Sequence, residues 1–446
     1  MKLKLIVASM SMLGLMTAPA FAHNTKGHEH PNYKGDALPS TLSTCPKVDA
    51  YQPLLDAMNQ NVGRAKPTVD CNKPIQFAGG INFDYQMLGP LNNGFMGENN
   101  NRFALNDAYL NATGHINRWV DAFLEVSYSN INAIPEDAVL AGGPHGADVP
   151  KPGIYSEAYD TNTLTLQQGY IFVGNLEELP FFAKLGKQFL DYGRYTIHPI
   201  TRSMTQVMTE SLQTAAQASF ISSWNGFDLH GSAFAFQNTL GQVDSNDIAL
   251  GDIDGHQRTN YGGQIGFGRI SDQLGFDVGV GYMYDMVGIN DVAYAVSLFR
   301  SGDVNADGFY QKRVNALTAY ATLNTGPFSF NGHYATALQH FNAGDLGAAS
   351  TTATDGAKPW AFDVAAAFNF SYWEKSQSLY VGYQQSGDAV SLFIPENRWV
   401  AGYGVDVMKN TNLALEYTHD SDYSESDGGT GENSNRLAVR LGVKFG

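Results

Sequence analysis

IQFAGGINFDYQM, residues 75–87, places large apolar side chains at most of its odd-numbered positions and polar or small ones between them. This period of two predicts a β-strand with one apolar and one polar face. NRLAVRLGVKF, residues 435–445, alternates in the same way, and the pattern recurs through the chain between these two stretches. In a transmembrane barrel the apolar face meets lipid and the polar face meets a wet lumen.

Segments of this kind predict an all-β fold, a transmembrane antiparallel barrel of sixteen strands within residues 75–446. Each segment has roughly the ten residues that a tilted spanning strand needs. Short connections such as Asn225-Gly226 alternate with long ones rich in Asn, Asp, Gly and Ser, as in outer-membrane barrels. The predicted strands lie near 75–87, 102–116, 119–130, 162–174, 181–191, 217–225, 227–238, 259–269, 274–287, 309–324, 328–340, 359–371, 378–387, 397–408, 412–421 and 435–445.

The composition agrees with many short strands. The chain has 446 residues, 47 of them Gly and 49 of them Tyr or Phe. A helical membrane protein of this length would contain several apolar runs of about 20 residues, whereas the sequence has one long apolar run, at its start. The formal charge of −16 and the absence of a basic run exclude a nucleic-acid partner.

Residues 1–22 are typical of a signal peptide: Lys2 and Lys4 precede an apolar core, and Ala20-Phe21-Ala22 gives a cleavage site. The alternative is an N-terminal membrane anchor. Residues 23–74 then form an N-terminal periplasmic segment without alternating strands. Its two cysteines, Cys45 and Cys71, are expected to pair in an exported protein, the alternative being two free thiols.

A long connection after the fifth predicted strand, residues 192–216, contains Arg194, His198 and Arg202 and few of the residues that mark a solvated loop. We expect it to fold into the lumen as a constriction; the alternative is a loop that caps the rim. Since Arg forks match carboxylates well, these three residues, with the inward-facing Lys184 and Arg398, are our candidates for pore lining and ligand binding.

Two ion pairs are predicted for the lumen wall. If the last two strands pair symmetrically about the loop 422–434, Glu416 faces Arg440 and Asp420 faces Arg436. Opposite charges directly across a strand pair stabilise it, so this pattern assigns the four residues to the wall.

Enzyme and cofactor signatures are missing from the sequence, which has no G-x-S-x-G, H-E-x-x-H or Walker pattern. Residues 303–308 resemble the start of a calcium loop, but Val314 stands where the loop needs a bidentate Glu. His23, His28 and His30 are expected to lie in a solvated tail. We therefore expect no catalytic activity, no cofactor and no metal.

Two short motifs suggest a family. Leu105–Leu110 (LNDAYL) and Gly186–Phe189 (GKQF) make the chain resemble the siderophore porins typified by the legiobactin receptor (LbtU-type); the second motif, with Tyr192–Arg194 (YGR), is also similar to phosphate-type porins. The resemblance spans the barrel and implies uptake of a ferric siderophore across the outer membrane of a Gram-negative bacterium, in contact with lipid and lipopolysaccharide. It transfers no ligand residue.

The barrel leaves little room for a plug, since energy-coupled receptors are plugged barrels of about 22 strands. Two further functions stay open: a general or phosphate-type diffusion porin, and a structural or adhesive surface barrel.

Overall fold

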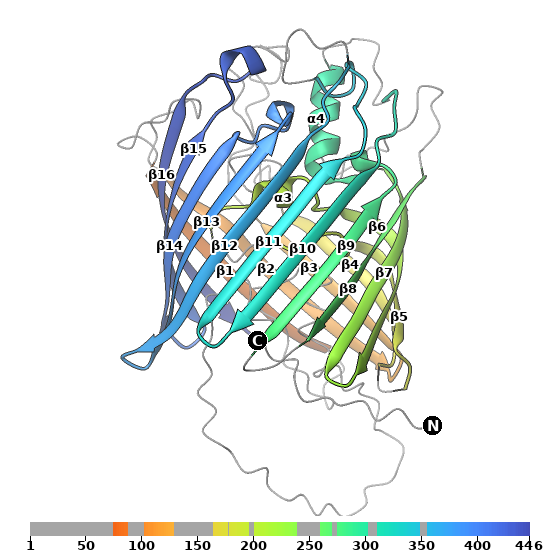
Figure 1. Cartoon of the computed structure of the whole chain (residues 1–446). Coiled ribbons are helices and arrows are strands. Elements are labelled where there is room, and N and C mark those ends of the chain that lie inside the picture. The colour runs from red at the N-terminus through yellow and green to blue at the C-terminus, as the bar shows by residue number, and fades with distance from the viewer. Residues whose placement is uncertain are drawn as a thin grey trace, which may run out of the picture.

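A closed ring of strands makes up most of the described chain (Figure 1). The computed structural model describes residues 75–87, 102–128, 164–176, 178–195, 200–238, 259–269, 274–301, 310–347 and 355–446. Sixteen strands, each antiparallel to both neighbours, close where β1 pairs with β16, so the predicted barrel is confirmed. The strands are β1 (Ile75–Met87), β2 (Arg102–Asn117), β3 (Val120–Tyr128), β4 (Leu164–Gly174), β5 (Phe181–Phe189), β6 (Leu212–Trp224), β7 (Phe227–Gln237), β8 (Thr259–Arg269), β9 (Gly275–Met283), β10 (Ala316–Thr325), β11 (Phe328–Ala337), β12 (Trp360–Tyr372), β13 (Lys375–Gly387), β14 (Asn397–Met408), β15 (Thr411–Ser421) and β16 (Asn433–Phe445).

Short helical elements lie between strands. They are α3 (Met204–Val207), η7 (Met286–Gly288), α4 (Asn290–Ser301), η8 (Val390–Leu392) and η9 (Glu425–Asp427). Among the described residues, no helix is both long and apolar enough to cross a membrane. The predicted signal peptide, the segment 23–74 and the cysteine pair lie outside the described residues.

The strand bounds differ from prediction mainly at the long-loop end of the barrel. The strand predicted at 217–225 begins at Leu212, because residues 212–216 continue the ladder with β5. The predicted long connection therefore ends at Ser211 rather than at residue 216. The strand predicted at 309–324 begins at Ala316, because residues 310–315 pack over the barrel mouth instead of pairing.

Tight turns join strands at the end where the C-terminus lies (Figure 1). Asn225 and Gly226, between β6 and β7, both have positive φ, 51° and 79°. Two such residues form the type I′ turn whose twist matches paired strands, which explains why Asn-Gly stands there. Trp373 and Glu374 make the corresponding turn between β12 and β13, with φ of 50° and 58°.

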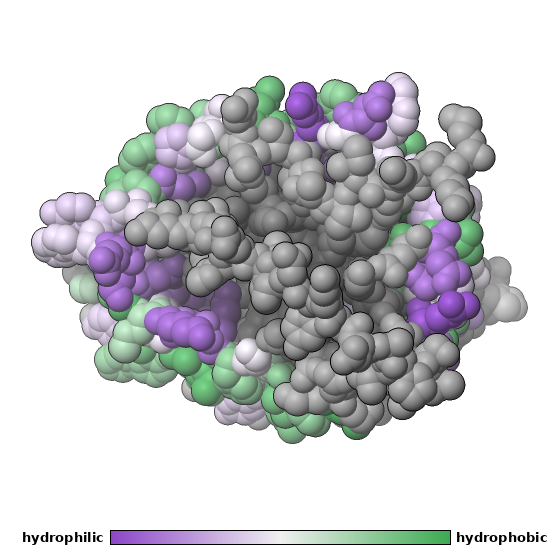
Figure 2. All heavy atoms as spheres, turned by 90° about the horizontal axis from the view of Figure 1, so that it is seen from below, coloured by the Kyte–Doolittle hydropathy of each residue, from purple (hydrophilic) through white to green (hydrophobic). Residues whose placement is uncertain are grey.

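Apolar side chains cover the outside of the ring. On β1, Ile75, Phe77 and Ile81 are between 48% and 60% exposed, while Asp84 on the opposite face is 0% exposed. Figure 2, seen from the end with the tight turns, shows hydrophobic residues along the outer edge. An apolar exterior around a polar interior is the arrangement of a transmembrane barrel.

The predicted ion pairs between β15 and β16 are wrong by two residues. Glu416 lies opposite Ala438, and Arg440 lies opposite Ala414; Asp420 and Arg436 are likewise separated. β16 starts at Asn433 rather than at residue 435, since the loop closes earlier through a hydrogen bond from the Asp422 amide to the Glu432 carbonyl, 2.9 Å. A shift of two keeps each residue on its face, so all four still point inward.

The charged side chains on these strands find other partners. Arg440 donates to Asp84 on β1, with Nε to Oδ1 at 2.7 Å, and Asp420 accepts from Arg398 on β14. Ion pairs across the neighbouring strands thus replace the pairs expected within the hairpin.

Candidate functional site

Two described stretches of the chain, residues 190–195 and 200–211, lie inside the barrel between β5 and β6. They start and end at one place, because Phe189 and Leu212 on either side of them are paired in the ladder. Leu190, Tyr192 and Met204 are 0% exposed, which a loop spread over the rim would not give. Figure 1 shows α3, which belongs to the second stretch, within the ring of strands. We call residues 190–195 and 200–211 the lumen segment.

Residues 190–195, the first limb of the lumen segment, are hydrogen-bonded to β7 and β8. Ser232 donates to Asp191 Oδ2 at 2.8 Å, and Gln264 Nε2 donates to Asp191 Oδ1 at 2.9 Å. The Gly193 amide donates to Gln264 Oε1 at 2.6 Å. Gly193 has φ of +93°, and a Cβ there would lie 2.9 Å from the Thr209 hydroxyl, so the turn and the packing both require glycine.

Arg194 lies at the end of this limb, buried between β9 and β10. Its Nη1 donates to Asp191 Oδ1 at 2.7 Å, its Nε is 4.0 Å from Asp277 Oδ2, and its guanidinium lies over the Tyr320 ring, 5.0 Å from the centroid. Burial by itself lowers the pKa of Arg194, but Tyr320, Asp191 and Asp277 together raise that pKa above its ordinary value. An arginine side chain stays protonated in proteins, so this guanidinium is a permanent cation held by the wall.

Residues 200–211, the second limb of the lumen segment, contact β16, β15, β14, β13 and β12 in turn. Thr201 donates to Glu416 and accepts from Arg436. The Arg202 carbonyl accepts from Arg398 Nη1 at 3.2 Å. Further along, the Met204 amide donates to the Gln384 side chain at 3.0 Å, and the Thr205 hydroxyl donates to Asp363. The inward polar residues of five strands thus anchor successive residues of one limb.

Arg202 joins the lumen segment to α4. Its Nη2 lies 2.9 Å from Glu210 Oε1 and 2.6 Å from Asp291 Oδ2, and Asp291 lies in the first turn of α4. The inner face of α4, including Val292 and Ala293, is fully buried. It packs with residues of the lumen segment and of the loops after β9, β11 and β13 in one apolar core. This core fills the long-loop end of the lumen along β6–β13.

The ligand candidates from the sequence lie inside the barrel where the structure describes them. Arg194 and Arg202 are 6% and 9% exposed, and both are paired with carboxylates. Arg398, 1% exposed, gives two hydrogen bonds to Asp420. Lys184 is buried on the inner face of β5, with its Nζ 5.5 Å from the centroid of the Tyr170 ring. His198 lies outside the described residues.

The ion pairs give Arg194, Arg202 and Arg398 a structural role inside the barrel. Removing one partner of a buried pair costs about 3–5 kcal/mol, so these guanidinium groups hold the lumen segment in place. Their direct contact with a solute stays a prediction. Sequence reasoning missed the anchoring side chains Gln264, Gln384 and Asp363, whose only signal was their place on the polar face of a strand.

The inner face of β1–β4 carries acidic side chains. Asp84, Asp107, Asp121 and Glu125 point inward from these strands. The side chains described on these four strands include no Lys or Arg. We call the inner face of β1–β4 the acidic arc. Within the described residues, no group of three His, Cys, Asp or Glu side chains is placed to hold a metal ion.

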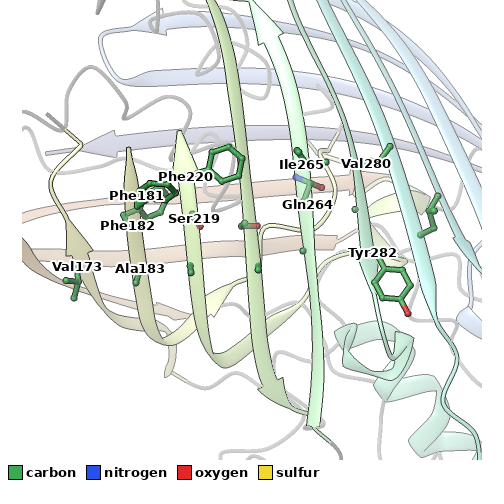
Figure 3. A pocket seen from close by; sticks show the side chains of 16 residues that line it. Val173, Phe181, Phe182, Ala183, Ser219, Phe220, Gln264, Ile265, Val280 and Tyr282 are labelled. Atoms are coloured by element: carbon green, nitrogen blue, oxygen red, sulfur yellow. The ribbon is translucent and has the colours of Figure 1, made fainter. Parts of the chain in front are cut away.

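A groove of about 800 Å³ lies on the outer wall across β4–β10 (Figure 3). Outward Ala183, Ala218, Ala233 and Gly263 stand side by side on β5–β8 and form its floor. Larger apolar side chains, including Phe220, border it. The groove belongs to the apolar exterior and is separate from the lumen.

Comparisons with known proteins give relatives without a stated activity. No family model matches the chain. A UPF0422 protein of Coxiella burnetii is 27% identical over 278 residues, which cover 62% of this chain and 55% of the relative. A UPF0422 protein of Legionella pneumophila (strain Lens) is 22% identical over 358 residues, which cover 76% of this chain and 61% of the relative. The chain thus spans less than two thirds of the length of these curated relatives.

Solved structures of outer-membrane porins share the fold. OprB of Pseudomonas putida superimposes with a TM-score of 0.52 at 12% identity, over 84% of this chain and 95% of that chain. OmpF of Salmonella typhi, solved in complex with daunomycin, gives 0.48 at 13% identity, over 83% of this chain and 97% of that chain. The likeness to OprB places this chain among barrels of porin architecture.

Proposed function

We propose that the protein is a channel in the outer membrane of a Gram-negative bacterium, through which a small solute crosses. The observation that carries the proposal is a closed ring of sixteen strands with an apolar outside and a charged inside. Barrels of this size leave an aqueous channel. The tight turns then face the periplasm and the long loops face outward, with lipid and lipopolysaccharide around the wall.

The solute path that we propose runs beside the acidic arc. The apolar core fills the outer end of the lumen along β6–β13, and the lumen segment is anchored to β6–β16. We place the constriction of the channel between the lumen segment and the acidic arc. Catalysis has no part in this proposal.

A ferric siderophore is the solute class that we propose. The support is the resemblance to LbtU-type siderophore porins through Leu105–Leu110 and Gly186–Phe189, and the names of the curated relatives add nothing to it. A phosphate-type porin is the alternative that the likeness of Gly186–Phe189 and Tyr192–Arg194 to such porins favours. A general diffusion porin is the alternative that the barrel architecture favours.

The proposal is tested by ferric-chelate uptake in a strain that lacks the protein, complemented with matched variants. Thr113 points into the lumen and its neighbour Ala112 points outward, opposite Gln76 and Phe77 of β1 respectively. Uptake should be lost without the protein, restored by the wild type and by Ala112→Trp, and reduced by Thr113→Trp.

Two results would contradict parts of the proposal. Purified protein that conducts neither ions nor sugars in a planar bilayer would remove the channel. Fast diffusion of sugars, with chelate uptake independent of the protein, would leave a general porin and remove the siderophore.

A further inference from the structure

The groove on the outer wall, which we call the outer groove, crosses the membrane-facing surface obliquely. It extends from β4 to β10, six strand spacings or about 29 Å. Figure 3 labels Val173 and Phe181 at one side of it and Tyr282 at the other. Val173 and Phe181 lie at the tight-turn ends of β4 and β5, whereas Tyr282 is one residue from the long-loop end of β9. The outer groove therefore ends, at β9, close to the long-loop side of the wall.

A cluster of tyrosines with one arginine lies at this end of the outer groove. Tyr282 lines the groove, and Tyr284, two residues further along the chain, stacks on Tyr261 with ring centroids 4.5 Å apart. The Cζ atom of Arg313 lies 5.1 Å from the centroid of the Tyr284 ring. Tyr261 and Tyr282 are 49% and 38% exposed. Tyrosines on the outside of a barrel mark the boundary between lipid and water, so the Arg313 guanidinium is held at the level of lipid headgroups.

The GKQF motif places a second cation on the outer wall. Gln188 is 0% exposed and faces the lumen, so its neighbour Lys187 faces outward, on the same side of β5 as Leu185, which is 49% exposed. Lys187 is two residues from Phe189, where β5 ends on the long-loop side. An outward cation is costly at mid-depth and tolerated toward the interface. The long stem of Lys187 also lets its ammonium group reach toward the headgroups.

The two cations are available to an external anion. Neither Lys187 nor Arg313 forms an ion pair with a carboxylate in the part of the chain that the structure describes. The whole chain has a formal charge of −16, so it repels an anionic lipid except where cations gather. Between β5 and β9 there are four strand spacings, about 19 Å. Lys187 and Arg313 therefore border the outer groove on two sides, at a spacing that suits a headgroup with more than one phosphate.

We propose that the outer groove, with Lys187 and Arg313, binds a phosphorylated glycolipid of the outer leaflet, the lipid A part of lipopolysaccharide. Its acyl chains lie along the floor formed by Ala218, Ala233 and Gly263, where no long side chain stands in the way. Its phosphates meet the Lys187 ammonium and the Arg313 guanidinium, whose fork of donors matches phosphate oxygens. The site rests on the proposed position in the outer membrane with the long loops outward, and it does not depend on conduction.

Binding of purified lipid A to the folded protein in detergent micelles tests the cations. The amount of lipid A that stays bound is measured by native mass spectrometry. Lys187→Gln/Arg313→Gln should weaken binding about tenfold relative to the wild type. The control, Lys375→Gln/Lys409→Gln, removes two exposed cations at the tight-turn end and should leave binding unchanged. Equal affinity in all three proteins would overturn the proposal.

Filling the outer groove tests the place of the acyl chains. Ala233→Trp should weaken lipid A binding about tenfold, whereas Val381→Trp, which is also on the lipid face but on β13, should leave binding unchanged. The folded barrel is verified for each variant by its heat-dependent shift in gel electrophoresis. If Ala233→Trp separates an oligomer of the wild type and lipid A binding stays unchanged, the groove is a contact between subunits and the proposal fails.

Lipid A from which the phosphates have been removed separates headgroup from chains. It should bind the wild type about tenfold more weakly than intact lipid A, and it should bind Lys187→Gln/Arg313→Gln equally weakly. Binding as tight as that of intact lipid A would refute the role of the two cations. A protein that binds lipid A without conducting fails only as a channel, and one that conducts without binding lipid A fails only at this site.

Discussion

Replacing Arg398 by Met should destabilise the barrel far more than loss of an exposed charge does. Arg398 Nε donates to Asp420 Oδ1 at 2.6 Å, Nη2 donates to Asp420 Oδ2 at 3.0 Å, and Nη1 reaches the Arg202 carbonyl. The two paired side chains are 1% and 3% exposed. Arg398→Met leaves a buried carboxylate without its cation, which costs about 3–5 kcal/mol.

The double variant Arg398→Met/Asp420→Leu separates charge from packing. Replacing a whole buried pair by apolar side chains is often neutral, and the lost hydrogen bond to the Arg202 carbonyl is worth about 1 kcal/mol. The double variant should therefore lie within about 1 kcal/mol of the wild type. Arg118→Met is the exposed control: Arg118 lies 3.0 Å from Glu178, with side chains 59% and 45% exposed, and such pairs contribute about 0–1 kcal/mol.

The measurement is guanidinium unfolding in detergent micelles, followed by tryptophan fluorescence and by gel mobility without heating. The midpoint of unfolding should fall strongly for Arg398→Met and little for the double variant and for Arg118→Met. If Arg398→Met and Arg118→Met lose equal stability, the pair does not hold the wall. If the double variant loses as much stability as Arg398→Met or more, the coupling that we infer between the charges is absent.

Two further predictions come from the fold and a third from the sequence. Gly193→Ala should cost about 1–3 kcal/mol more than Gly226→Ala in the same unfolding assay, since both have positive φ but only Gly193 has atoms within 3.0 Å of an added Cβ. Val381→Arg, on the lipid face of β13 and 50% exposed, should cost about 2–4 kcal/mol, and Met408→Arg at the strand end about 0–1; equal costs would contradict the membrane position. The two cysteines should resist alkylation in unreduced, denatured protein, and two labelled thiols would disprove their pairing.

The sequence alone was enough to predict the strands and the face on which each of their residues lies. A strand places successive side chains on opposite sides, so the alternation in residues 75–87 and 435–445 determines which residues meet lipid and which meet the lumen. The tight turn at Asn225-Gly226 could also be predicted from local sequence, because these two residues take positive φ at little cost. Because alternation gives the face of a residue, the inward direction of Glu416 and Arg440 could be predicted. Their pairing partners could not.

Register, the path of the lumen segment and the covering of the barrel mouth were decided only by tertiary structure. Register between β15 and β16 depends on where the loop closes at Asp422, a contact across the hairpin. The lumen segment lies where Gln384 and Asp363 bind it, and these residues are more than 150 positions away in the chain. Ion pairs behave likewise, because Arg398 and Asp420 become partners only once β14 and β15 lie side by side. Alternation carries no record of such distant contacts, since it reports the face of each residue and not its neighbour.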